Sequence, residues 1–489
     1  MRSKEINSLS ITVKRTGIVL SPDPRRVVFR PFLIEPNRCV KIISRVMSLD
    51  DSQVDNELGV VMREFHGRHL NAHRYFLRRF SQVREHLLTD TEPSESRRLL
   101  IGAYFTMEYS LESAALFNPS MVWHPDQTGL ASGAGRFIIS MRATGEGHLS
   151  SITFRSGIID AACNITMDPV SQYVSAPELV LDAQYDAELF RRKLREVGIH
   201  GDFIDSVLSE CPPLFTEAEL EKAVAWHLSQ RNFDAAEADL HRRAMKTLIA
   251  SNYSIQFEKD QKLSERVMMP TSASERNGIE DARFVEFHDN NSSRYLATYS
   301  AYDGQIVLPQ LIETKDFQSF SVNTLNGAAV QNKGFAIFPR RINNKYVMLG
   351  RQDGENIYIM FSDFLHFWHD KIRILQPTFP WEFVQLGNCG SPIETDAGWL
   401  VLSHGVGPMR RYSIGAFLLD LNDPTKVIGR TRDPILTPDQ NEREGYVPNV
   451  VYSCGGLLHS DRLVIPYAMS DYASSFATIS ISELLADLT

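Results

Sequence analysis

Two stretches of the chain place apolar residues with the spacing of helices. From about Lys41 to Leu99, apolar positions such as Val61 and Phe65 recur at helical intervals, with many Arg and His residues on the other face. This spacing predicts two or three helices. A second helical stretch is predicted from about Ala176 to Ala250, where Thr216-Glu217-Ala218-Glu219 forms a capping box that starts a helix.

Most of the remaining chain has the two-residue period of strands. The predicted strands are short, β-branched or aromatic, and separated by Gly, Asn, Asp or Pro turns. They cover Arg136 to Arg142, Ser151 to Ile158, Ala282 to Phe287, Arg294 to Tyr302, Gly334 to Ile342, Tyr346 to Arg351, Asn356 to Phe361, Gly398 to His404, Tyr412 to Leu421, Asn449 to Cys454, Leu463 to Ala468 and Phe476 to Ile481. Such strands are typical of an all-β sandwich, barrel or propeller.

Polar or charged residues recur where these strands end, as expected for side chains that line the central funnel of a propeller. They are Arg142, Asp281, Arg351, His404 and Asp471. A propeller is therefore favoured. The sequence shows no strict repeat of blade length, and a β-sandwich would give the same local pattern, so a sandwich stays open.

Composition and charge narrow the function classes. The chain has 489 residues, 43% hydrophobic and 23% charged, and its formal net charge of -9 provides no basic field for nucleic acid. Its polar start and the short apolar patch Gly17 to Leu20 give no sign of export or a membrane span, so a cytoplasmic location is expected. Five cysteines without a Cys-x-x-Cys pair and fourteen scattered histidines indicate neither disulfides nor a metal.

The motifs of several common enzyme classes are missing. The sequence has no Walker-type phosphate loop, no Gly-x-Ser-x-Gly elbow, no His-Glu-x-x-His and no Gly-x-Gly-x-x-Gly after a strand. Nucleotide-driven and metalloprotease chemistries are therefore disfavoured.

The segment Glu280-Asp281-Ala282-Arg283 is the first candidate for chemistry. Because side chains alternate along a strand, only one of the two carboxylates is expected to face a given pocket. Arg283, two positions after Asp281, is expected on the same side, where it would fix the carboxylate by a bidentate pair. A solvated acidic turn would show the same residues.

Three cations lie on or beside apolar strands, namely Arg142, Lys333 and Arg351. If they converge they form a pocket suited to phosphate, because Arg offers a bidentate fork and Lys a point charge. If they do not, they are three rim side chains that reach into water. A glycine-rich turn from Gln385 to Thr395 leads into the strand that ends at His404, and its glycines permit close approach of a ligand.

Taken in chain order, these residues resemble glycoside hydrolase family 130, the mannoside phosphorylases and related β-mannosidases. The resemblance covers about Phe117 to the C-terminus apart from the helical insertion. It rests on Asn118-Pro119-Ser120, Arg142, Gly278-x-Glu280-Asp281-x-Arg283, Tyr299-Ser300-Ala301-Tyr302, Lys333 to Pro339, His404-Gly405-Val406, Gly415 to Asp420 and Pro448-Asn449-Val450. It implies a five-bladed β-propeller with the active site in the central funnel.

The resemblance also implies roles for single residues. Asp281 matches the proton donor, which acts through a hydroxyl of the bound mannose, and Asp471 matches a carboxylate that holds this mannose. The implied phosphate contacts are Arg142, Lys333, Arg351, Gln385 and His404. The other implied substrate contacts are Asn118, Glu280, Arg283, Tyr299 and Tyr302.

The chain departs from the family pattern at two positions. Ala282 stands where the family usually has Pro, a mild change in turn rigidity. Gln385 stands where many of the phosphorylases have Lys as a further phosphate contact. Gln still donates hydrogen bonds, so phosphate binding is weakened as an inference but not removed.

The expected reaction is inverting phosphorolysis of a terminal β-mannosyl unit to α-mannose 1-phosphate, with inorganic phosphate as co-substrate and no cofactor. An inverting hydrolase needs a separate base, whereas phosphate is already an anionic nucleophile. Gln385 and unplaced acids such as Glu146 and Glu355 keep a β-mannosidase open. The sequence also leaves open a β-1,4-mannoside phosphorylase and a carbohydrate-binding propeller without catalysis.

The predicted organisation has four parts. Residues 1–100 form a mainly helical N-terminal extension, 101–175 the first part of the propeller, 176–255 a helical insertion, and 256–489 the rest of the propeller with the catalytic site. Together with the run Gln385 to Tyr412, both helical regions resemble the longer 1,2-β-oligomannan phosphorylases, which points to β-1,2-linked substrates. These regions are expected to mediate self-association or to cover the funnel.

Overall fold

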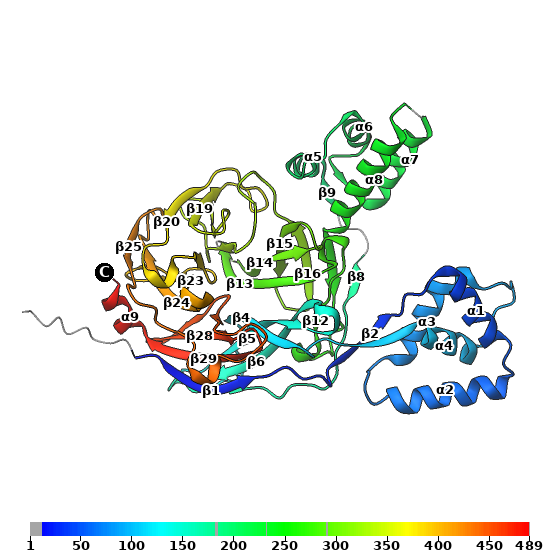
Figure 1. Ribbon diagram of the computed structural model, residues 1–489, viewed down its shortest axis with the longest axis horizontal. Helices are drawn as coiled ribbons and strands as arrows, with labels where there is room; N and C mark the ends of the chain where they lie inside the picture. Colours follow the sequence, from blue (N-terminus) through cyan, green and yellow to red (C-terminus); the bar gives the residue numbers. More distant parts are fainter. Residues whose placement is uncertain (1–11, 181–183, 231, 290–291, 489) are drawn as a thin grey trace, which may run out of the picture.

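The computed structural model describes residues 12–180, 184–230, 232–289 and 292–488, so the polar start of the chain lies outside the described residues. The described part is mostly β with some helices. Figure 1 shows the larger sheets gathered in one rounded body, from which two groups of helices project at separate places. No helix within the described ranges has both the length and the apolar character of a membrane span.

The N-terminal group contains four helices where two or three are predicted. They are α1 (Pro36–Met47), α2 (Asp51–Phe65), α3 (Ala72–Val83) and α4 (Glu95–Tyr104). Their shared core includes Ile43, Phe80 and Ile101, all buried. The two strands β2 (Val27–Pro31) and β3 (Thr106–Ser110) pair with each other and connect this group to the sheets.

The helical insertion has its own hydrophobic core. It consists of β9 (Tyr185–Asp186), α5 (Ala187–Glu196), α6 (Asp202–Glu210), β10 (Leu214–Phe215), α7 (Glu217–Gln230) and α8 (Ala235–Ala250). Phe190, Phe215 and Met245 are fully buried in that core. The predicted capping box is present, because the Thr216 backbone N–H donates to Glu219 Oε2 at 2.8 Å and the Glu219 N–H donates to Thr216 Oγ1 at 3.4 Å.

Five antiparallel sheets of four to six strands make up most of the remaining described chain. The first has the order β12 (Val267–Met268), β6 (Ser150–Ile159), β5 (Gly135–Thr144) and β4 (Ala115–Trp123), with β7 (Ile165–Met167) beside β6. The second has the order β13 (Ile279–Asp289), β14 (Ser292–Tyr302), β15 (Val307–Thr314), β16 (Ser319–Thr324), β11 (Tyr253–Gln256) and β8 (Glu178–Val180).

The other three sheets come from the C-terminal part of the chain. The third contains β17 (Ala336–Ile337), β18 (Tyr346–Gly350), β19 (Ile357–Ser362) and β20 (Ile372–Leu375). The fourth contains β21 (Gln385–Asn388), β23 (Gly398–Val406), β24 (Tyr412–Leu419) and β25 (Val427–Arg430), with β22 (Ile393–Thr395) beside β23. The fifth contains β1 (Lys14–Leu20), β29 (Ala473–Ser480), β28 (Arg462–Met469) and β26 (Val451–Tyr452), with β27 (Leu457–His459) beside β28.

The fifth sheet joins the two ends of the described chain. Strand β1 pairs antiparallel with β29, with Lys14 opposite Thr478, and α9 (Ile481–Asp487) follows directly. Arg15 on β1 also donates from Nε to Glu442 Oε1 at 2.8 Å. Part of the N-terminal extension is therefore built into a sheet rather than into the helical group.

One predicted strand is largely wrong. Between Gly334 and Ile342 the described strand is Ala336–Ile337, while Arg340 and Ile342 form isolated bridges to His288 and Lys345. Gly334 has a left-handed φ of 88°, and Pro339 has no N–H to donate to a ladder, so neither end of the predicted segment can continue the strand.

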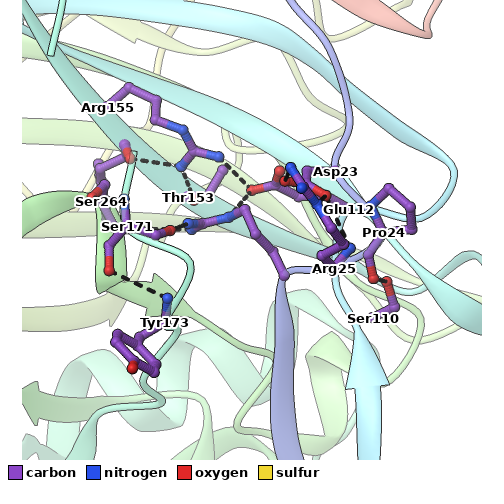
Figure 2. A network of polar contacts seen from close by, with 12 residues as sticks. Asp23, Pro24, Arg25, Ser110, Glu112, Thr153, Arg155, Ser171, Tyr173 and Ser264 are labelled. Carbon is purple, nitrogen blue, oxygen red and sulfur yellow. Dashed lines mark hydrogen bonds and ion pairs between the residues drawn. The ribbon is translucent and has the colours of Figure 1, made fainter. Parts of the chain in front are cut away.

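A buried ionic network connects the start of β2 to the first sheet. Glu112 Oε1 accepts hydrogen bonds from Arg26 Nε at 2.9 Å and from Arg155 Nη2 at 2.6 Å. Figure 2 shows Glu112 facing Arg155, whose other amine reaches Thr153. Arg26 donates further to the carbonyls of Ser171 and Ser264, so one side chain holds three separate segments together.

Candidate active site

Asp281 sits on a bulge near the start of β13. The register with β14 shifts between Glu280 and Arg283, and Asp281 has a left-handed φ of 55°. This conformation is uncommon outside Gly, and Asn and Asp adopt it more readily than most residues. The bulge breaks the alternation of side chains, so both Glu280 and Asp281 contact Arg142. The expectation that only one carboxylate faces the site is therefore wrong.

A second bulge lies opposite the first and carries Asn118. The register of β4 shifts between Phe117 and Ser120, and Asn118 also has a left-handed φ of 50°. Its side-chain amide donates to Asp281 Oδ1 at 2.6 Å, and both residues are buried. Two bulges on neighbouring sheets thus meet at the candidate acid.

Arg142, Lys333 and Glu280 form one charged cluster beside Asp281. Arg142 donates from Nη2 to Glu280 Oε1 at 2.9 Å, and its Nη1 lies 3.7 Å from Asp281 Oδ1. Ser150 Oγ accepts from Arg142 Nε at 2.8 Å and fixes the guanidinium from the other side. Lys333 Nζ lies 3.5 Å from Glu280 Oε2. Arg142 and Lys333 therefore converge on Glu280, which is one of the two arrangements that the sequence leaves open for these cations.

Arg283 does not form the predicted bidentate pair with the Asp281 carboxylate. Its Nη1 donates to the Asp281 backbone carbonyl at 3.1 Å, Nε donates to the Cys389 carbonyl and Nη2 donates to the Tyr452 hydroxyl. The prediction assumed regular alternation, which would place the Asp281 and Arg283 side chains on the same side of the strand. The bulge between Glu280 and Arg283 breaks this alternation. Arg283 is instead fully buried under the turn and holds its backbone.

The net effect of this environment is to keep Asp281 ionised. Burial alone would raise its pKa, but Arg142, Arg283 and Lys333, together with the hydrogen bond from Asn118, outweigh burial and lower the pKa below its ordinary value. Any anion that offsets these cations would raise the pKa of Asp281 again.

Arg351 and His404 form a second buried pair. Arg351 Nη1 lies 3.5 Å from His404 Nε2, and burial, followed by the charges of Arg351 and Arg283, lowers the pKa of His404 well below its usual value. His404 is therefore neutral. A side chain at Gly334 would place its Cβ 2.7 Å from Arg351 Nε, and one at Gly387 would place it 2.5 Å from His404 Cε1. These glycines make room for the pair.

Asp471 is a second carboxylate, and the negative charge of Asp281 affects its pKa. It follows β28 in a left-handed turn with φ of 49°. Burial, and next the negative charge of Asp281, raise the pKa of Asp471 to about 6. Arg142 and Arg410 act in the opposite direction. The pKa values of Asp281 and Asp471 are therefore shifted in opposite directions.

The remaining predicted contacts lie in different surroundings. Gln385 begins β21 opposite Val406, where its side chain is partly exposed. Tyr299 is buried and its hydroxyl donates to Glu275, whereas the Tyr302 hydroxyl donates to the Gly304 carbonyl. Neither tyrosine hydroxyl reaches Asp281, so their role as sugar contacts stays a prediction.

Sequence reasoning missed Ser150, Tyr452 and Glu275. Tyr452 contacts Arg283 from a distant part of the chain, whereas Ser150 contacts Arg142 from the neighbouring strand β6. The local sequence pattern predicts neither contact. The run Ser272 to Glu275 does carry a signal, because Ser-x-x-Glu is a capping-box pattern shortly before the segment that contains Asp281. Within the described ranges, no group of three or more His, Cys, Asp or Glu side chains is placed to hold a metal ion.

Comparisons with known proteins identify relatives. A family model described as beta-1,4-mannooligosaccharide phosphorylase, of glycoside hydrolase family 130, matches residues 241–489. A 1,2-beta-oligomannan phosphorylase from Thermoanaerobacter sp. (strain X514) is 33% identical over 283 residues, which are 55% of this chain and 91% of the relative. A beta-1,2-mannobiose phosphorylase from Listeria innocua is 36% identical over 229 residues, 45% of this chain and 63% of the relative.

A solved structure gives a further comparison. The Listeria innocua beta-1,2-mannobiose phosphorylase in complex with beta-1,2-mannobiose aligns with a TM-score of 0.46 and 25% identity. The alignment covers 77% of this chain and 92% of that one.

Proposed function

The chain belongs to glycoside hydrolase family 130, and we propose that it is an inverting phosphorylase that cleaves a terminal β-1,2-mannosyl unit with inorganic phosphate to give α-mannose 1-phosphate. The names of two relatives that match over different lengths, a 1,2-beta-oligomannan phosphorylase and a beta-1,2-mannobiose phosphorylase, support the reaction and the linkage.

The observation that carries this proposal is the convergence of cations on one buried acid. Arg142 and Lys333 both contact Glu280 beside Asp281, and the Asp281 residue is only 8% exposed. A phosphate ion needs such cations, because they reduce its repulsion from the acid and hold its attacking oxygen. Water as nucleophile would need a base instead of them.

The same cations explain how Asp281 can act as an acid. Before phosphate binds, they keep its pKa low. A phosphate dianion bound to Arg142 and Lys333 would offset their charge and raise the pKa of Asp281, so the acid gains its proton when the nucleophile is in place. Phosphate oxygen then bonds to the anomeric carbon while the glycosidic bond breaks, and the proton of Asp281 passes through a mannose hydroxyl to the departing oxygen.

Arg351, His404 and Gln385 complete the proposed phosphate contacts, and Asp471 is proposed to hold the mannose. Neutral His404 accepts or donates a hydrogen bond without adding charge. Phosphate is the co-substrate, and the chemistry needs no cofactor.

The proposed architecture is a five-bladed β-propeller with both helical regions as additions. The five antiparallel sheets of four to six strands and their rounded arrangement support it. The cytoplasmic location, the four-part division of the chain and self-association through the helices stay predictions.

Linkage specificity can be tested by comparing β-1,2-mannobiose with β-1,4-mannobiose, each incubated with phosphate and analysed for mannose 1-phosphate. We expect the β-1,2 substrate to give a kcat/KM at least about tenfold higher, since a misplaced acceptor sugar loses transition-state contacts worth over about 1 kcal/mol. Preference for the β-1,4 substrate would contradict the proposed linkage and leave the phosphorylase reaction standing.

A further inference from the structure

Glu275 is a fully buried carboxylate located six residues before Asp281. It ends the short helix η4 (Ala273–Glu275) and is 0% exposed. Its Oε1 accepts from the hydroxyl of Tyr253 at 2.9 Å and from that of Tyr299. Its Oε2 accepts from the backbone N–H groups of Thr271 at 2.8 Å and Ser272 at 3.0 Å. All four donors are neutral groups, so the Glu275 carboxyl group is satisfied by hydrogen bonds from two tyrosines and two backbone N–H groups.

The carboxylate bonds fix the position of Glu275, whose backbone carbonyl in turn contacts the segment that leads to Asp281. The Glu275 carbonyl accepts from the Gly278 N–H at 2.7 Å, and the Gly278 carbonyl accepts from the Tyr302 N–H at 3.2 Å. Gly278 has a left-handed φ of 126°, and a side chain there would collide with Ser150, the residue that orients Arg142. The position of Glu275 therefore determines where the segment leading to Asp281 begins.

The same cluster contacts the end of the helical insertion. Helix α8 ends at Ala250, and the next residue, Ser251, is fully buried with its Oγ 2.8 Å from Ser274 Oγ. Tyr253 follows on β11, the strand that leaves the insertion. Burial, together with the charge of Glu275, raises the pKa of Tyr253 well above its usual value, so its hydroxyl stays a donor.

Asp471 is supported by a similar arrangement. Glu442 ends the short helix η7 (Gln440–Glu442) and accepts from the Tyr467 hydroxyl at 2.6 Å. Its backbone carbonyl accepts from Ser470 Oγ at 2.5 Å, directly before Asp471. Arg15 adds a cation that Glu275 does not have among its donors. Each strained carboxylate of the site thus has a buried Glu and a Tyr beneath its turn.

We propose that Glu275 is a positioning residue for Asp281, and that through Tyr253 and Ser251 it connects the end of the helical insertion to the catalytic turn. The inference rests on the proposed function, because it takes Asp281 as the acid of that reaction. Without Glu275 the turn loses its fixed start, and Asp281 no longer delivers its proton at the required distance.

The test compares two substrates that differ in their need for a proton. β-1,2-Mannobiose needs an acid for its leaving sugar, whereas β-mannosyl fluoride releases fluoride without one. For Glu275→Ala we expect kcat on β-1,2-mannobiose to fall about 100-fold, the loss expected for a group displaced by about 1 Å, and kcat on the fluoride to fall less than about fivefold. A purely structural role lowers both rates equally by reducing the fraction of active protein.

Glu275→Gln is the conservative variant. Its ratio of kcat on β-1,2-mannobiose to kcat on β-mannosyl fluoride should return most of the way to that of the wild type. Its amide oxygen can face the two N–H groups while the tyrosine hydroxyls rotate to accept from its NH2. Glu265→Ala is the matched control, because Glu265 ends the similar short helix η3 (Leu263–Glu265) and caps the Lys262 N–H, yet the strand after it carries no site residue. Its ratio of rates should equal that of the wild type.

Equal losses on both substrates, or no loss on β-1,2-mannobiose, would overturn the inference. If Glu275→Ala does not fold, Tyr253→Phe decides, since it removes only the donor next to the insertion and must lower the ratio in the same direction. The inference and the proposed function fail separately. The ratio of the two kcat values can be measured whether the product is mannose or mannose 1-phosphate, so it tests the inference alone. The proposed function fails if the wild type cleaves β-1,2-mannobiose without phosphate.

Discussion

At the scale of single residues, the site depends on side chains held in left-handed conformations. Asn118, Asp281 and Asp471 have φ values of 50°, 55° and 49°, and all three lie where a charge or hydrogen bond must be aimed accurately. Such conformations raise the energy of the folded chain by about 1 kcal/mol each and persist only where the surroundings enforce them. Arg283 and Glu275 supply those surroundings beneath Asp281 by binding the backbone of its turn.

Asp471 should make the stability of the protein depend on pH. Its pKa is raised to about 6, against 3.8 for a free side chain, so the folded state binds its proton more tightly than the unfolded state. Its stabilising contribution is therefore complete below about pH 4 and is lost as the pH rises through about 6, a change of about 3 kcal/mol in all. Asp471→Asn cannot ionise, so the variant should gain stability over the wild type as the pH increases.

Thermal unfolding midpoints of the wild type and Asp471→Asn, measured from about pH 4 to about pH 7, check this prediction. Asp461→Asn, which removes a mostly exposed carboxylate, is the control variant. A difference between the midpoints of Asp471→Asn and the wild type that does not change with pH would contradict the raised pKa.

At the scale of secondary-structure elements, the sequence predicts what depends on periodicity. It locates both helical regions, the capping box at Thr216 and most strands. It does not predict the bulges at Asn118 and Asp281, because a bulge is defined by the register with a partner strand that the sequence of one strand does not specify. Arg142 and Lys333 converge beside Asp281, an arrangement that the sequence leaves open. The expected bidentate pair of Arg283 and the expectation that only one of Glu280 and Asp281 faces the site are wrong.

The insertion should unfold as a unit of its own, because its core residues come only from the segment between Tyr185 and Ile249. Phe190→Ala removes a fully buried ring from this core and should lower its stability by about 3 to 5 kcal/mol. Hydrogen exchange should then become faster in helices α5 to α8, while β23 keeps its protection.

Leu240→Ala is the control for this measurement, since Leu240 lies on α8 but is 56% exposed. It should leave exchange unchanged. Faster exchange in β23 to the same extent as in the helices would mean that the insertion and the sheets unfold together.

At the scale of the whole molecule, long-range contacts join the N-terminal extension to the sheets, although the sequence pattern predicts them as separate parts. Strand β1 completes the sheet of the C-terminal strands, and Glu112 holds Arg26 beside Arg155 (Figure 2). The predicted boundary at residue 100 does not reflect these contacts, because the residues that make them are far apart in the sequence. The contacts of β1 and Arg26 fix the segment before the helical group to the sheets, and those of Glu112 fix the segment after it.

Glu112→Gln tests the buried network. Removing the carboxylate leaves Arg26 and Arg155 as neighbouring buried cations, and the loss of one partner from such a group lowers the free energy of unfolding by about 3 to 5 kcal/mol. Asp23→Asn, in the exposed pair with Arg25, should leave the guanidinium unfolding midpoint unchanged. Equal small effects of both variants would show that the network adds little to stability.

The central claim is that cations around Asp281 make phosphate, and not water, the nucleophile. The direct measurement is ³¹P NMR of β-1,2-mannobiose incubated with phosphate and the protein, with Asp281→Asn as the inactive control. We expect one inorganic phosphate to disappear for each bond cleaved and one α-mannose 1-phosphate to form, at a rate that Asp281→Asn lowers about 100-fold or more. Release of free mannose with the phosphate signal unchanged would contradict this claim.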